Sequence, residues 1–452
     1  MPEPKGNELL DIAARIAGWA RDGEQVEAYV TRGRETDVRV HDGGIEQLST
    51  ADSEGVGIRV IADHRQGFAW GGSLDPEVVE EALAEARDNA TFATPDEFLG
   101  LAVPDGVPAP DVDPYDEALV SFDTNAKIDL AMELERATRA ADPRIRAIEA
   151  ADYGDGLAES AIATSTGLSV WSRRTVVALS TSVMAGEGDD TQTGFGVCFG
   201  RSPADVDVER AAHDAVKRAT RMLGATKPAS ARLTVVLEPF VTAAFVSVLA
   251  STLNGEAVLK GRSFFGDRLG EEVSAPFVTL VDDASDPAAS GAGRYDAEGL
   301  ASRRTALIED GVLRSFLYNT HAARRAGTAS TGSAVRAGFK SGPGCGARAI
   351  SLAPGDRSQG QLIEGIELGL LVQSVSGLHS GVNPVSGDFS VGAEGLMIRH
   401  GALAEPVREI TISSTIQRML KGVLAVGDDL EWNYGPAAHV TLAMADLSMS
   451  GT

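Results

Sequence analysis

Residues 376–395 constrain the fold of this chain most, because this run is too rich in glycine for a helix and too long for an ordinary turn. They read SGLHSGVNPVSGDFSVGAEG, a run rich in glycine and serine, and strand-like residues follow at 396–398. Glycine is needed where φ is positive or where another segment approaches the backbone closely. We therefore expect a polar loop that feeds strands and offers backbone groups to a ligand. A glycine-rich hairpin that serves only the fold is the alternative interpretation.

Length and composition indicate a soluble globular protein. A chain of 452 residues usually forms two or three domains, and 43% of these residues are hydrophobic. The sequence contains no apolar run long enough for a membrane span. Its first residues, MPEPKGNELLD, have neither a basic start nor an apolar signal core. This start predicts a cytoplasmic protein.

Charge and cysteine content exclude some partners and compartments. The formal net charge of −25 repels phosphate backbones and anionic membrane surfaces, so we expect neither nucleic acid nor membrane as a partner. Cys198 and Cys345 lie far apart in unrelated surroundings, which does not suggest a disulfide framework. A reducing compartment fits this cysteine content.

The first half of the chain predicts a helix followed by an antiparallel meander. A helix is expected over residues 7–20, and then Val26, Ala28 and Val30 alternate with Glu27 and Tyr29 as in a half-buried strand. Further strands are expected at 38–40, 57–61, 67–70, 145–150, 160–163 and 175–182, and further helices at 75–90, 124–140 and 205–223. A proline-rich loop spans about 100–114.

The second half predicts many short strands and few helices. A strand at 233–237 is followed by a helix through about residue 253, and most later segments alternate as strands. The fold class predicted is α+β, with an N-terminal mixed helix and antiparallel-sheet domain over 1–226. The second domain, over 229–452, is expected to be a mainly antiparallel β domain.

The glycine-rich stretch also carries a family resemblance. GVNPVSGDFSVGAEG, followed by RHGALAEPVREITIS, resembles the C-terminal signature of the TldD/PmbA family. The order of predicted elements fits that family along most of the chain. The resemblance implies a link to a zinc metallopeptidase built from two related chains.

The zinc-binding residues of such a peptidase are missing here. A metallopeptidase helix needs two His four residues apart with a Glu between them. The helix at the matching place reads PFVTAAFVSVLAS, residues 239–251, without His or Glu, and no Cys follows Cys345. The chain therefore resembles the TldE/PmbA-type companion, which implies no cofactor in this chain and zinc in a homologous TldD-type partner.

The resemblance further implies a heteromeric chamber that admits unfolded or small peptides. No catalytic residue and no metal ligand is then expected in this chain. An extended peptide would add as a strand to a sheet edge, bound largely through its backbone. The candidates for contact with peptide or partner are the polar groups of the loop: His379, Ser380, Asn383, Asp388 and Ser390.

Several alternatives remain at this point. Distant residues could assemble a metal site, for instance His379 with Asp388 and His400. A metal-free hydrolase or amidase could use Ser380, although GLHSG places the serine one position late for a nucleophile elbow. A homodimer could also bind peptides without cutting them.

Other charged stretches favour solvated loops. The stretch 332–341, with Arg336 and Lys340, has the wrong spacing for a phosphate loop and could meet an acidic partner. Two acidic clusters follow strands in the manner of turn residues. They comprise Glu187, Asp189 and Asp190, and Asp282, Asp283 and Asp286.

Overall fold

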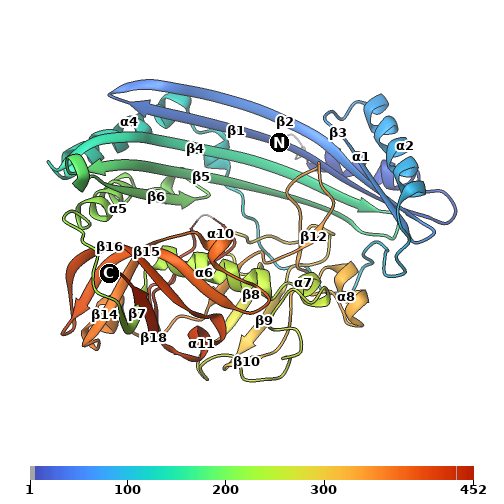
Figure 1. Cartoon of the computed structure of the whole chain (residues 1–452). Coiled ribbons are helices and arrows are strands. Elements are labelled where there is room, and N and C mark those ends of the chain that lie inside the picture. The colour runs from blue at the N-terminus through green and yellow to red at the C-terminus, as the bar shows by residue number, and fades with distance from the viewer. Residues whose placement is uncertain (1–5, 434) are drawn as a thin grey trace.

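The computed structural model describes residues 6–433 and 435–452. It has an α+β fold, as the sequence predicts: a long antiparallel sheet with helices, and a β-rich part that contains a small barrel (Figure 1). The division at residues 226–229 into two independent domains stays a prediction. In the described part of the chain, no helix is long and apolar enough to cross a membrane.

The N-terminal sheet has six strands in the order β3-β2-β1-β4-β5-β6, all antiparallel. The predicted antiparallel meander is confirmed, but it has fewer strands than expected. Residues 26–30 and 38–40 belong to one continuous strand, β1, and residues 145–150 and 160–163 belong to another, β4. Asp42 and Gly43, both with positive φ, turn β1 into β2. The bounds are β1 Glu24–His41, β2 Gly44–Ala62, β3 Arg65–Gly71, β4 Ile145–Thr164, β5 Ser169–Ala185 and β6 Gln192–Gly200.

Two pairs of helices cover the two ends of one sheet face. Helices α1 (Gly6–Ala17) and α2 (Pro76–Phe92) pack on Val26, Ala28 and Val30. At the other end, α4 (Thr124–Ala141) and α5 (Val208–Thr220) pack against the sheet, and the core there includes Val38 and Val40. The short helix α3 (Glu117–Val120) precedes α4. The middle of this sheet face lies between the two helix pairs.

The C-terminal part is built on a closed barrel. Strands β16-β15-β14-β7-β18 are paired in this order, and β16 also pairs with β18 and closes the ring. The β7–β14 pair is parallel, whereas the sequence predicts mainly antiparallel pairing. The bounds are β7 Ala231–Leu237, β14 Leu368–Ser376, β15 Asp388–Arg399, β16 Ala402–Thr415, β17 Val423–Val426 and β18 Leu442–Ser450.

Short elements surround the barrel. Helix α6 (Pro239–Thr252) follows β7, and a small sheet has the order β10-β9-β8-β13. A two-stranded hairpin, β11 with β12, extends toward the N-terminal sheet (Figure 1). Their bounds are β8 Leu280–Asp283, β9 Arg304–Glu309, β10 Val312–Leu313, β11 Ala334–Val335, β12 Gly344–Cys345 and β13 Ile350–Leu352. The remaining helices are α7 Gly255–Leu259, α8 Thr320–Ala326, α9 Gln359–Glu364, α10 Leu378–Gly381 and α11 Ile416–Lys421, with 3₁₀ turns η1 Gly188–Asp190 and η2 Pro203–Asp205.

The loop of this hairpin docks on the N-terminal sheet, which corrects two expectations. Arg336 is not solvated: its side chain is 1% exposed, and its guanidinium donates to Glu27 Oε1 at 2.5 Å. Glu27 is therefore buried and does not lie on a solvent-exposed face of the strand. Its carboxylate also accepts a hydrogen bond from the Arg59 guanidinium at 2.5 Å. Burial alone would raise the pKa of the Glu27 carboxyl, but Arg59 and Arg336 outweigh it and hold that pKa below its ordinary value.

Candidate functional site

The glycine-rich loop joins β14 to β15, and hydrogen bonds to its backbone groups hold it in place. The Asn383 side chain accepts from the amides of Val385 (2.9 Å) and Ser386 (3.2 Å), and the Ile416 amide donates to the Gly387 carbonyl at 2.7 Å. Gly387 has a φ of 81°, and at Gly381 a Cβ would lie 2.1 Å from the Ser390 carbonyl oxygen. The glycines are thus needed for the reasons that the sequence suggested, and the loop has a defined conformation.

An open hollow lies on this loop, and four of the five candidate residues line it: Ser380, Asn383, Asp388 and Ser390. These side chains are exposed, and His379 is exposed too but does not line the hollow. The lining is polar and carries one carboxylate, that of Asp388, which accepts from the Ser386 hydroxyl at 2.6 Å. Such a surface can exchange hydrogen bonds with an extended peptide backbone.

Four lining residues were not among the sequence candidates: Ser376, Gly377, Gly381 and Gly392. Ser376 and Gly392 face each other across β14 and β15. The alternation of β15 could have revealed Gly392. Asp388 and Ser390 are exposed whereas Phe389 and Val391 are buried, so every second residue points to the hollow.

The alternative metal site is not assembled. His400 follows β15 at its far end, so about 35 Å of strand separates it from Asp388. Its ring instead pairs with Glu367. Across residues 6–433 and 435–452, no group of three or more His, Cys, Asp or Glu is placed to hold a metal ion.

The alternative nucleophile also lacks its geometry. Ser380 Oγ donates to the Gly377 carbonyl oxygen, 3.3 Å away within the same turn. Among the hydrogen bonds of the described residues, none joins the His379 ring to Ser380 or Asp388. A serine nucleophile needs a base within about 3 Å of its hydroxyl, so the structure gives Ser380 no such partner.

Helix α6 contains residues 239–251, which the sequence analysis matched to the zinc-binding helix of a TldD-type chain. Its outward positions recur at helical spacing: Phe240, Ser247 and Ser251 are exposed, and Ala244 and Val248 are half-buried. The two serine hydroxyls donate to carbonyls of their own helix. No side chain on this outward face is a usual zinc ligand.

The surroundings of α6 are aromatic. The Phe240 ring lies 4.8 Å from that of Phe195 and 5.8 Å from the imidazole of His439, between ring centroids. Burial lowers the pKa of His439, so this imidazole is neutral at neutral pH. It acts as a packing group beside the helix.

Of the two acidic clusters, one is partly buried, contrary to the expectation of solvated turns. Asp282 is 4% exposed and accepts from the amides of Arg348 and Ala349 at 2.9 and 2.6 Å. Its carboxylate therefore organises the backbone between β8 and β13. Asp189 remains on the surface.

Comparison with known proteins supports the family resemblance along the chain. Residues 230–451 match the PmbA/TldA metallopeptidase C-terminal domain, 117–223 the central domain and 26–90 domain 1. Metalloprotease PmbA of Escherichia coli O157:H7 is 27% identical over 94% of this chain and 91% of its own length.

Two solved structures share the fold. The structure of a putative modulator of DNA gyrase from Bacteroides thetaiotaomicron superposes with a TM-score of 0.89 at 25% identity, over all of both chains. TldE from Thermococcus kodakarensis superposes with a TM-score of 0.88 at 22% identity, over 98% of this chain and 99% of its own. Together with the three matched domains, these relatives show that the chain is a PmbA/TldE-type member of the TldD/PmbA metallopeptidase family.

Proposed function

We propose that this chain is the zinc-free subunit of a heteromeric metallopeptidase. Its TldD-type partner holds the zinc, and the two chains together enclose a chamber for unfolded or small peptides. The observation that supports this proposal most is the outward face of α6. Its exposed side chains are Phe240, Ser247 and Ser251, although the chain belongs to a family of metallopeptidases. A helix with these side chains cannot supply the paired imidazoles and the carboxylate that zinc hydrolysis needs.

The hollow on the glycine-rich loop is proposed to bind the peptide or to brace the partner's site. Its lining hydroxyls, the Asn383 amide and the Asp388 carboxylate can pair with backbone N–H and C=O groups without selecting one side-chain sequence. This fits a subunit that holds peptides while the chemistry takes place on the partner.

Activity of the separate and combined chains tests the proposal. The chain purified alone should bind well below one zinc per chain and should cleave no unfolded peptide, whereas addition of the partner should give cleavage that a chelator abolishes. Chelator-resistant cleavage by this chain alone would refute the subunit role. Loss of that cleavage in Ser380→Ala would then assign it to the hydrolase alternative.

A substitution in the hollow tests its role separately. Ser390→Leu fills the hollow from an exposed strand position and should raise KM for peptide about tenfold, which corresponds to about 1.4 kcal/mol. Ser450→Leu is the matched control, because it also changes an exposed serine of the barrel but lies outside the hollow. Equal KM values for the two variants would remove the hollow from peptide binding.

A further inference from the structure

The N-terminal sheet has a long unpaired edge. Strand β2 runs over residues 44–62, but β3 pairs only with Val56–Ala62. Residues 44–55 are hydrogen-bonded to β1 on one side, and within the described part of the chain no strand pairs with their other side. At about 3.4 Å per residue, this edge is about 40 Å long. Figure 1 shows it across the sheet from the C-terminal barrel.

This edge lacks most of the devices that protect a sheet edge against pairing with another chain. Native sheets protect edges with prolines, charged side chains (above all lysine), bulges or covering segments. Residues 44–55 contain no Pro, Lys or Arg, and their charged side chains are Glu46, Asp52 and Glu54. Nine of these twelve residues are exposed, and only Gly55 is buried. The pairing of β1 with β2 shifts only between Arg39 and Val40, near the turn, so the backbone beyond it is regular.

Apolar side chains extend from the core to this edge. Leu48 and Ile45 are 47% and 48% exposed, and they lie opposite Val38 and Val40 of β1. Cross-strand neighbours point to the same sheet face, and these two valines belong to the core beneath α4. Val38 and Val40 themselves are buried, so the apolar surface continues from the core under α4 to the exposed side chains of Ile45 and Leu48.

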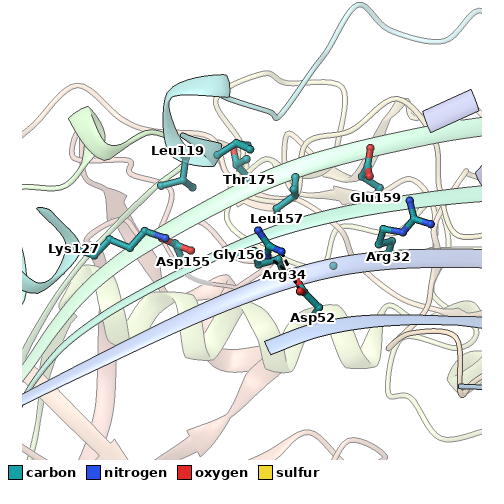
Figure 2. A pocket seen from close by; sticks show the side chains of 12 residues that line it. Arg32, Arg34, Asp52, Leu119, Lys127, Asp155, Gly156, Leu157, Glu159 and Thr175 are labelled. Atoms are coloured by element: carbon teal, nitrogen blue, oxygen red, sulfur yellow. Dashed lines mark hydrogen bonds and ion pairs between the residues drawn. The ribbon is translucent and has the colours of Figure 1, made fainter. Parts of the chain in front are cut away.

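A pocket of about 230 Å³ adjoins the edge on the same face, beside Leu119 of α3 and Lys127 of α4 (Figure 2). Its apolar part comprises Leu119, Leu157 and Val120, the last of which is 46% exposed. Asp52 belongs to both the pocket and the edge, where it pairs with Arg34 at 2.7 Å. Edge and pocket therefore form one continuous surface, which we call the β2 edge surface.

We infer that the partner subunit adds a strand to the β2 edge surface and continues the N-terminal sheet across the complex. This inference rests on the proposed heteromer. The added strand runs along residues 44–55, covers Ile45 and Leu48, and places an apolar side chain beside Val120. Its backbone satisfies the outward N–H and C=O groups of β2.

Length and charge favour the partner over other occupants. A typical strand of five or six residues covers only about half of this edge, whereas a chain of the same fold offers an edge of matching length and twist. In an antiparallel pairing centred on residues 49–50, a second copy would bring Glu46 of one chain near Asp52 and Glu54 of the other, in a chain of net charge −25. A partner edge with fewer acidic residues avoids this repulsion.

Lysine substitutions at exposed positions test the inference. Leu48→Lys and Val120→Lys change the β2 edge surface, and Leu403→Lys is the matched control, because Leu403 is also 47% exposed but lies on β16. Each tagged variant is recovered from its own cells, and native mass spectrometry measures the fraction of chain in the heteromer. Amide hydrogen exchange of residues 44–55 is compared between the wild-type complex and the free chain.

We expect the heteromer fraction to fall at least tenfold in Leu48→Lys and Val120→Lys, with the control unchanged. Amides of 44–55 should be protected only in the complex. A heteromer that survives both substitutions would overturn the inference and leave the proposed function intact. A wild-type homodimer lost in Leu48→Lys would assign the edge to a second copy, and wild-type chain without any companion would overturn both proposals.

Discussion

Substitution of Glu27 by Gln should loosen the contact between the N-terminal sheet and the hairpin of β11 and β12. Glu27 is 1% exposed and lies between the guanidinium groups of Arg59 and Arg336, each 2.5 Å away. Glutamine keeps the shape but removes the charge, so two buried cations lose their shared counter-charge. A second carboxylate, that of Glu298, is 3.8 Å from Arg59 and compensates only in part.

The size of the effect follows from the geometry. At an effective dielectric constant of about 20, two unit charges whose centres are about 4 Å apart attract each other by about 4 kcal/mol, most of which offsets the cost of burying the charges. Removal of one partner from a buried pair typically costs 3–5 kcal/mol. We expect a loss of about 4 kcal/mol in the free energy of unfolding, against a typical total of about 5–15 kcal/mol.

Urea denaturation, with hydrogen exchange of residues 334–345, measures this loss. Glu309→Gln is the matched control, because Glu309 pairs with Arg314 at 3.5 Å on the surface, where such pairs contribute about 0–1 kcal/mol. The reasoning would be refuted by a loss below about 1 kcal/mol in Glu27→Gln, equal to that of the control.

Two further predictions concern packing and pH. Gly196→Ala should lower the free energy of unfolding by about 3 kcal/mol, because the added Cβ would lie 1.8 Å from the Ala211 carbonyl oxygen of α5. Gly72→Ala is the control, because open space surrounds Gly72. Equal urea midpoints for the two variants would contradict this packing. Burial and the neighbouring Glu298 raise the pKa of Asp296 to about 6. Between about pH 6 and pH 4, the Asp296 carboxyl is protonated in the folded protein but ionised in the unfolded protein. The contribution of Asp296 to the free energy of unfolding therefore rises as the pH falls through this range. Wild type should gain stability relative to Asp296→Asn between pH 7.5 and 5, and a constant difference in urea midpoint would contradict the shifted pKa.

Local patterns predicted much of the N-terminal part. The alternation at Val26, Ala28 and Val30 and the turn at 42–43 predicted the meander, and helix α4 covers the residues 124–140 predicted for it. The break predicted within β4 was wrong, because Gly154 and Gly156 interrupt the apolar pattern while pairing with β1 and β5 continues through them. Pairing with two neighbours outweighs weak local preference.

Local sequence patterns could not predict the long-range contacts. The burial of Glu27 depends on Arg336, far along the chain, and the closure of the barrel depends on β16 meeting β18. The glycine-rich loop was predicted as a polar loop before strands, and four of its five candidate side chains line one hollow. Which of them touch peptide stays a prediction, since sequence shows residue types rather than a bound ligand.

The most direct test of the central claim is the native mass of the tagged protein recovered from its own cells, with zinc counted on the same sample. The proposed subunit role predicts a companion chain of similar size and about one zinc for each pair of chains. Zinc near one per chain in a preparation that contains only this protein would contradict it.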